Sequence, residues 1–191
     1  MYAFIDTTSK IIYGLLDAEF KWIDYCVLDS NKSSAKLHYL IHDTNEKNKI
    51  SLKQITRIFY CAGPGSYTGM RISEGLVNIF AWQDFEYNSF YQFDIPKICG
   101  VKQGMWYSKA FKGEFFTYEW SEGSVGTRSL IKEDELDSKL VEPNLFTTVE
   151  TVELIKNQSE IIFSKILKDN SKKELYYYRP LEEEFSQAKN E

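Results

Sequence analysis

The sequence predicts an α/β protein with two lobes, and three observations support this. The chain has 191 residues, 43% of them hydrophobic and 27% charged, which is close to the average of globular proteins. Short β-rich runs alternate with helical patterns through about the first 95 residues, and a hairpin and amphipathic helices follow. A chain of this length buries roughly 70% of its unfolded surface, so we expect a substantial core.

The first lobe is predicted to span residues 1–98. It begins with β-rich runs separated by short polar pieces, which predict three strands at Tyr2–Asp6, Ile11–Leu16 and Trp22–Leu28. Ser33-Ser34 is expected to cap a helix with Leu37, Leu40 and Ile41 on one face. A buried strand over Ile55–Ala62, a helix over Thr68–Trp82 and a strand over Tyr87–Phe93 complete the order βββαβαβ. This is the order of an actin-like or ribonuclease-H-like half.

A smaller second lobe is predicted over residues 99–180. Met105–Phe111 and Glu114–Trp120 resemble a hairpin, Lys132–Leu140 a short acidic helix and Thr151–Lys168 a longer amphipathic one. Glu174–Tyr178 is expected to form a final strand, and residues 181–191 a solvated tail.

Composition excludes several classes of protein. The longest apolar run, Ile58–Ala62, has five residues, whereas a membrane span needs about 20, and the first residues lack a secretory pattern. We therefore expect a cytoplasmic protein with no membrane contact. Cys26, Cys61 and Cys99 are odd in number and widely spaced, which predicts reduced thiols. A net charge of −5 with no basic cluster argues against strong autonomous nucleic-acid binding, so any RNA role would be indirect.

The most informative segment is the glycine-rich stretch Gly63-Pro64-Gly65-Ser66 and the helix that follows it. Pro64 and Gly65 suit the central positions of a type II turn, with a positive φ at Gly65. Ser66 is the expected N-cap of the helix. The stretch lacks the lysine of a Walker A loop, so a phosphate cradle has no support from it.

The predicted helix over Thr68–Trp82 is apolar on most of its circumference. Such a helix is either fully buried in its own domain or covered by its sheet on one side and a second subunit on the other. The small residues would permit close helix contact. The residues expected to contact a partner are Gly69, Met70, Arg71, Ile72, Ser73 and Leu76. Arg71 either pairs with Glu74 or faces a partner or anion.

The segment GPGSYTGMRI resembles the GPGS-F/Y-TG-x-RI signature of the TsaB (YeaZ) family. Three weaker similarities follow the family's order: Phe4-Ile5-Asp6-Thr7-Thr8 at the N-terminus, Lys112-Gly113-Glu114-Phe115-Phe116 in the second lobe and Tyr176-Tyr177-Tyr178-Arg179 near the end. The resemblance departs from the family where Lys109, Phe111 and Ser73 replace its usual residues, and the chain is shorter than typical members. These departures put contacts of the second lobe in doubt.

The resemblance implies an actin-like ATPase fold and a scaffold subunit without catalytic residues of its own. Such subunits pair with the catalytic paralogue TsaD and the ATPase TsaE to place a threonylcarbamoyl group on the adenosine next to the anticodon of tRNA. It implies no cofactor for this chain, ATP and a divalent metal being left to the partner subunits, and contact with tRNA only through the complex. Whether the isolated chain forms a homodimer stays open.

Three other constellations compete with this interpretation. His38 and His42 stand four residues apart and could share a metal, but they lack a third ligand at a defined spacing, so we expect no metal and ordinary polar helix residues. Asp6 ends the first predicted strand and is followed by Thr7 and Thr8. Actin-like ATPases place a carboxylate at this position. Asp6 is therefore either part of a vestigial nucleotide site, the functional carboxylate of an ATP-dependent phosphotransferase, or a structural cap of nearby backbone amides. Ser66 lacks the G-x-S-x-G context of a hydrolase.

The aromatic residues, 16% of the chain, are mostly expected in the core. Phe116, Tyr118 and Trp120 share one face of a predicted strand. They could stack bases if basic groups gathered nearby.

Overall fold

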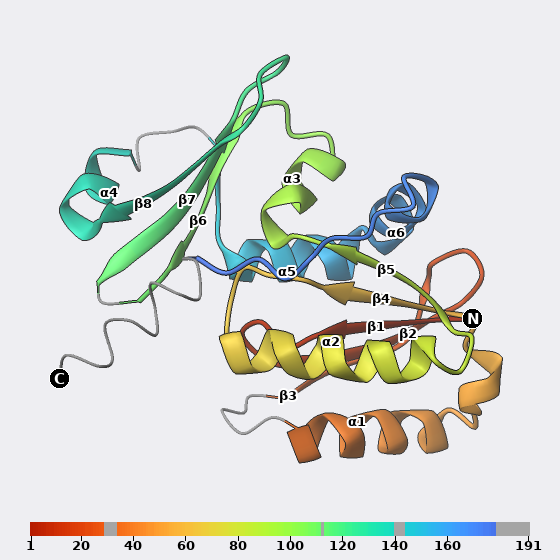
Figure 1. The fold of residues 1–191 in the computed structure, drawn as a ribbon. Helices are drawn as coiled ribbons and strands as arrows, with labels where there is room; N and C mark the ends of the chain where they lie inside the picture. Colours follow the sequence, from red (N-terminus) through yellow and green to blue (C-terminus); the bar gives the residue numbers. More distant parts are fainter. Residues whose placement is uncertain (29–33, 112, 140–143, 179–191) are drawn as a thin grey trace, which may run out of the picture.

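The computed structural model describes residues 1–28, 34–111, 113–139 and 144–178. Ser33, Lys112, Leu140, Arg179 and the predicted tail at 181–191 lie outside the described residues. Two sheets form the framework (Figure 1). Their elements, in chain order, are β1 Tyr2–Asp6, β2 Ile11–Leu16, β3 Trp22–Leu28, α1 Ser34–Lys47, η1 Leu52–Gln54, β4 Arg57–Cys61, α2 Tyr67–Ala81, β5 Glu86–Phe90, η2 Gln92–Asp94, α3 Ile95–Ile98, β6 Gly104–Lys109, β7 Glu114–Trp120, β8 Thr127–Lys132, α4 Glu133–Lys139, β9 Leu145–Phe146, α5 Thr148–Asn157 and α6 Ser159–Lys168.

The first sheet has the strand order β3-β2-β1-β4-β5. β1, β2 and β3 pair antiparallel, whereas β1, β4 and β5 run parallel. Alternating side chains point to opposite faces of these strands, so the sheet has two apolar faces. α1 and α2 cover one face, and α5 and α6 cover the other (Figure 1). The predicted order βββαβαβ is confirmed, and the fold is actin-like.

Phenylalanine rings fill the core between the first sheet and α6. Phe163 of α6 lies 5.4 Å from Phe4 and 4.9 Å from Phe59 between ring centroids, and all three rings are fully buried. Helices from the C-terminal half of the chain therefore complete the core of the N-terminal sheet. The division of the chain at residue 98 stays a prediction.

The second sheet has the order β8-β7-β6-β9. The predicted hairpin is confirmed as β6 and β7, but β8 was not predicted and lies immediately before the acidic helix, now α4. The predicted helix over 151–168 is two helices, because Gln158 has non-helical dihedral angles between α5 and α6.

The expected final strand over residues 174–178 is wrong, because this segment has no strand conformation and belongs to neither sheet. Several hydrogen bonds, most of them to Ser89, attach the C-terminal segment, residues 171–178, to the first sheet instead. The Ser89 amide donates to the Ser171 carbonyl at 2.9 Å, and the Tyr176 amide donates to the Ala62 carbonyl at 2.8 Å. The segment thereby runs from the edge strand β5 to the end of β4.

Candidate functional site

The glycine-rich stretch turns the chain from β4 into α2. Ser66 caps α2 as predicted, because its hydroxyl accepts a hydrogen bond from the Gly69 amide at 3.2 Å. The expected type II turn is wrong: the positive φ, +117°, belongs to Gly63, and the Gly63–Pro64 peptide bond is cis. Gly65 is needed for space instead, because a Cβ there would lie 2.5 Å from the Thr8 carbonyl oxygen.

The end of β1 packs directly against this turn. The Thr8 carbonyl accepts a hydrogen bond from the Ser66 amide at 2.6 Å. The Thr7 hydroxyl donates to the Gly69 carbonyl at 2.6 Å and lies within 2.6 Å of the Ser73 hydroxyl. A Cβ on Gly69 would come within 1.8 Å of the Thr7 carbonyl oxygen. The small residues of the turn therefore serve close approach to the chain's own first strand.

Asp6 is the centre of a buried polar network. One carboxylate oxygen, Oδ1, accepts hydrogen bonds from the Thr8 amide at 2.8 Å and the Thr8 hydroxyl at 2.6 Å. The other, Oδ2, accepts from Nε2 of Gln92 at 3.2 Å, and the same Nε2 also donates to the Thr8 hydroxyl at 2.6 Å. Only 1% of Asp6 is exposed, and this burial raises its pKa above the usual range, against the opposing effect of the hydrogen bonds.

Gln92 is the member of this network that the sequence did not reveal. It follows β5, is fully buried, and its backbone amide donates to the Gly63 carbonyl at 2.9 Å. Its Oε1 atom has no hydrogen-bond partner among the described residues. A buried glutamine carries no local sequence signal, so only the meeting of β1, β4 and β5 brings it to Asp6. The structure thus gathers Asp6, Thr7, Thr8 and the turn into one network satisfied largely from within the chain.

The residues predicted to contact a partner divide between two faces of α2. Gly69, Met70, Ser73 and Leu76 are buried inside the chain, so the expected contact line along Gly69 and Ser73 is wrong. Its small side chains match the end of β1 instead of another subunit. Arg71 is exposed and Ile72 half-buried.

The outer face of α2 also carries apolar side chains. Ile79 is 50% exposed and Trp82, at the end of the helix, 85% exposed. Gly75 lies on the same side, and a Cβ there would meet no atom within 4 Å. This outer face of α2, with Gly75, Ile79 and Trp82, is an apolar surface that the described residues leave uncovered.

Arg71 has the local partner that its position predicts. Its guanidinium lies 3.7 Å from the Glu74 carboxylate, at the exposed start of the helix. The Tyr177 hydroxyl raises the pKa of Arg71 further, and the ring of Tyr177 lies 5.2 Å from that of Tyr67. The C-terminal segment therefore lies against the first turn of α2.

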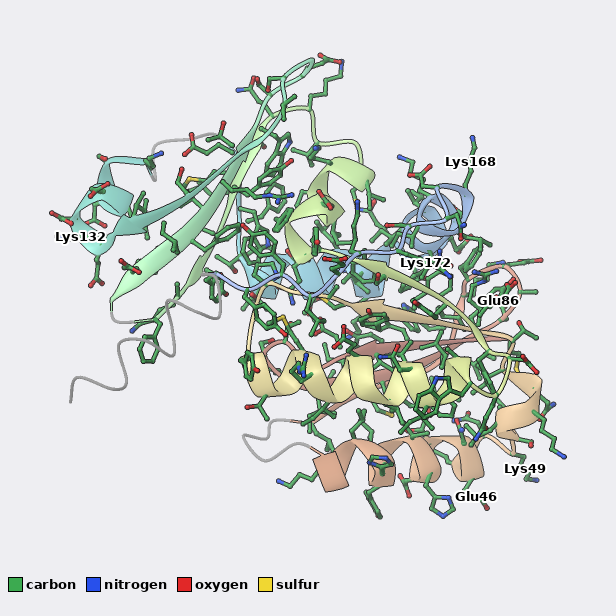
Figure 2. The ribbon with its side chains drawn as sticks, viewed as in Figure 1. Glu46, Lys49, Glu86, Lys132, Lys168 and Lys172 are labelled. Carbon is green, nitrogen blue, oxygen red and sulfur yellow. The ribbon has the colours of Figure 1, made fainter. Side chains whose placement is uncertain are left out.

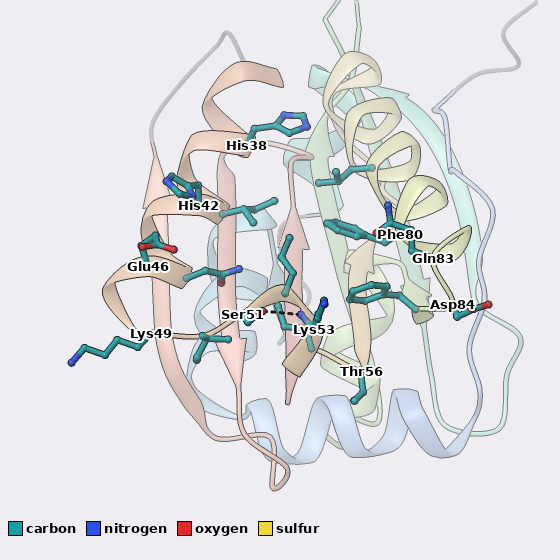
Figure 3. Close-up of a pocket in the computed structure, with 17 residues that line it drawn as sticks. His38, His42, Glu46, Lys49, Ser51, Lys53, Thr56, Phe80, Gln83 and Asp84 are labelled. Atoms are coloured by element: carbon teal, nitrogen blue, oxygen red, sulfur yellow. Dashed lines mark hydrogen bonds between the residues drawn. The ribbon is translucent and has the colours of Figure 1, made fainter.

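A groove of about 1250 Å³ separates α1 from α2 (Figure 3). His38 and His42 line it from α1, and Phe80 lines it from α2. Across the described ranges, no group of three or more His, Cys, Asp or Glu side chains is arranged to hold a metal ion. The groove is therefore a mixed surface in which both histidines accompany apolar side chains.

The structure also tests the expectations for the aromatic residues and the cysteines. Phe116, Tyr118 and Trp120 are at most 5% exposed, so the expectation that they could stack bases is wrong; they belong to a buried aromatic cluster beside the second sheet. Cys26, Cys61 and Cys99 are free, as predicted. In the part of the chain that the structure describes, no helix is long and apolar enough to cross a membrane.

Two solved structures from Pseudomonas aeruginosa share this architecture. YeaZ matches with a TM-score of 0.53 and 19% identity over 70% of this chain and 68% of that one. The chain has a YeaZ-like fold. An uncharacterized protein with similarity to peptidase YeaZ matches with a TM-score of 0.54 and 19% identity over 69% of this chain and 67% of that one. No family model and no curated protein matches the chain.

Proposed function

We propose that this protein is a scaffold subunit that pairs with a TsaD-like catalytic paralogue in the formation of threonylcarbamoyladenosine in tRNA. The observation that carries the proposal is the apolar outer face of α2 on a YeaZ-like fold, with Trp82 85% exposed. The GPGSYTGMRI segment, which resembles the TsaB signature, forms the turn and helix that present this face.

The proposed docking surface combines the outer face of α2 with the groove beside α1. Trp82 and Ile79 offer exposed apolar area, and Phe80 lines the groove behind them. Tyr39 on α1 is also exposed, with 66% of its surface accessible, although it does not line the groove. Aromatic anchors beside a groove are typical of the residues that dominate binding energy at protein interfaces.

The assembly we propose contains this chain, the TsaD-like subunit and a TsaE-like ATPase in the cytoplasm. ATP and a divalent metal would be used by those partners, and tRNA would be held mainly by the complex. In the absence of its partner, the same apolar face would support a homodimer.

An ATP-dependent phosphotransferase that uses Asp6 has less support. Both Asp6 oxygens accept hydrogen bonds from Thr8 or Gln92, and Gly65 approaches Thr8 so closely that a Cβ would not fit between them. The carboxylate is therefore engaged within the chain. Titration of the isolated protein with Mg-ATP tests this alternative: micromolar binding that disappears in Asp6→Ala would favour the enzyme over the scaffold.

The scaffold proposal is tested by co-elution with a TsaD-like protein. Trp82→Arg replaces the most exposed apolar side chain of the proposed surface by a charge and should weaken association by at least about 2 kcal/mol, roughly 30-fold in Kd. The fold should be unaffected, because a cation at a helix C-terminus interacts favourably with the helix dipole.

Val125→Arg is the matched control for this experiment. Val125 is 95% exposed in the connection between β7 and β8, far along the chain from α2. It makes the same kind of change, apolar to cationic, on the second lobe. Equal loss of co-elution in both variants, or unchanged co-elution in Trp82→Arg, would contradict the proposed surface.

A further inference from the structure

Three cations from separate elements gather around aromatic rings beside the second sheet. Lys97 comes from α3, Arg128 from β8 and Lys173 from the C-terminal segment, and all three residues are exposed. α3 lies between the second sheet and α6, with the C-terminal segment beneath it (Figure 1). Residues far apart in the sequence thus form one row, which we call the cation row.

A continuous set of rings supports the cation row. Lys97 lies 5.4 Å from the centre of the Tyr118 ring and donates to its hydroxyl at 3.0 Å. The Phe93 ring is 4.6 Å from that of Tyr118, and the Arg128 guanidinium lies 5.0 Å from Phe93.

Tyr91 continues the set of rings on the other side of Phe93. It lies 5.0 Å from Phe93, and Arg128 and Lys173 each lie 5.8 Å from its ring centre. Arg128 also lies 5.0 Å from the centre of the Tyr176 ring, which is the third ring around its guanidinium. Contacts within about 6 Å hold Arg128 and Lys173 against the rings, whereas Lys97 is held by its hydrogen bond to the Tyr118 hydroxyl; all three side chains remain exposed to a ligand.

The cations at and beside the row outnumber the carboxylates close to it. Asp94 is half-buried near the three cations; burial raises its pKa, and the charges of Lys173, Lys97 and Arg128 oppose that rise. Burial raises the pKa of Tyr91, at one end of the row, and the negative charge of the nearby Glu174 raises it further. Lys172, labelled in Figure 2, extends the positive charge along the same segment and lies 4.5 Å from the Tyr87 ring centre. A local excess of positive charge on a chain of net charge −5 calls for an anionic ligand.

We propose that the cation row binds successive phosphates of an RNA backbone. Each cation is held by a different ring along the set, Lys97 by Tyr118, Arg128 by Phe93 and Lys173 by Tyr91, which suits a chain of phosphates. Phe93 and Tyr118 are at most 5% exposed, so they offer no face for base stacking, and the contact would be independent of sequence. The choice of RNA rests on the proposed function, and it gives this subunit a direct contact beyond an indirect role.

The expected strength follows from the number of charges. Three phosphate contacts on a single strand predict a slope of about −2 for log K against log salt, and non-specific affinities of about 10⁻⁴ to 10⁻⁶ M. Affinity should therefore fall about 20-fold between roughly 50 and 200 mM salt. This is weak binding, in line with the overall negative charge.

The experiment measures binding of the full chain to a labelled, unstructured RNA of mixed sequence by fluorescence anisotropy across that salt range. Lys97→Gln, Arg128→Gln and Lys173→Gln should each reduce the steepness of the slope by about 0.7. Lys53→Gln is the matched control: it removes an exposed charge on η1, in the first lobe, and should leave the slope unchanged. Circular dichroism confirms that each variant is folded, and Lys173→Gln keeps the test valid if Arg128→Gln unfolds.

Several outcomes would overturn the inference. One is a slope of log K against log salt that is near zero. Another is an equal change of that slope in Lys53→Gln and Lys173→Gln. A third is saturable binding of inorganic phosphate at the row without any binding of RNA. The last would assign the row to a small anion. Because no partner subunit is present, failure here leaves the proposed function standing, and failure of co-elution leaves this result standing.

Discussion

Replacing Gly69 by alanine tests the contact that fixes the start of α2 against β1. A Cβ at this position would lie 1.8 Å from the Thr7 carbonyl oxygen, whereas ordinary contacts are 3.4–4 Å. The obstacle is backbone, so β1 and α2 would have to separate by well over one ångström. That movement would also disturb the hydrogen bond from the Thr7 hydroxyl to the Gly69 carbonyl.

The magnitude follows from two opposing effects. Overpacking of a tight core costs about 1–3 kcal/mol, and contact with backbone places Gly69→Ala at the upper end. The gain in helix propensity offsets about 1 kcal/mol, which leaves a net loss of about 2 kcal/mol. For a chain of this size the loss corresponds to a melting temperature lower by about 4–8 °C.

Gly75→Ala is the matched control on the same helix. Gly75 is exposed and an added Cβ would meet nothing within 4 Å, so only the propensity gain of up to about 1 kcal/mol should remain. Thermal unfolding of both variants by circular dichroism should therefore give shifts of opposite sign. A Gly69→Ala protein as stable as the wild type would refute the proposed packing of α2 on β1.

Two further predictions concern titratable side chains. His38→Ala combined with His42→Ala should leave metal content at background and partner binding within a few-fold; stoichiometric zinc by elemental analysis, lost in the double variant, would contradict this. The pKa of Asp6 is raised above its ordinary 3.8 in the folded chain, so the folded state binds more protons than the unfolded state between the two pKa values, and stability is lost as pH rises through that interval. Asp6→Asn lacks this loss, and Gln92 can turn its unpartnered Oε1 toward the new amide. The melting temperature of the wild type relative to Asp6→Asn should therefore fall as the pH rises above the ordinary carboxyl pKa, and a difference that does not change with pH would argue against a protonation effect at Asp6.

Local sequence patterns predict most helices and strands within residues 1–98. Alternating β-rich runs gave β1 to β3, and the capping chemistry of Ser66 gave the start of α2. Proline followed by glycine is typical of a type II turn, so the sequence predicts a positive φ at Gly65. In the structure the positive φ belongs to Gly63, and Gly65 is required because Thr8 approaches it closely. Contacts between distant segments, which decide such details, leave no trace in a short motif.

The parts that escaped prediction depend on tertiary contacts. β8 is a short strand held by its pairing with β7, and the C-terminal segment is attached by several hydrogen bonds to Ser89 and one to the Ala62 carbonyl. The inward direction of Ser73 also depends on a distant residue, Thr7, which bonds to its hydroxyl. An apolar helix with two candidate faces cannot be oriented from periodicity alone, so the sequence pointed to α2 but not to its outward side.

We propose that this chain supports formation of threonylcarbamoyladenosine through the outer face of α2. The most direct measurement is the content of that nucleoside in tRNA, by mass spectrometry, from cells depleted of this protein and complemented with variants. We expect the modification to be lost on depletion, restored by the wild type and Val125→Arg, and not restored by Trp82→Arg. Unchanged modification after depletion, or full restoration by Trp82→Arg, would contradict the account.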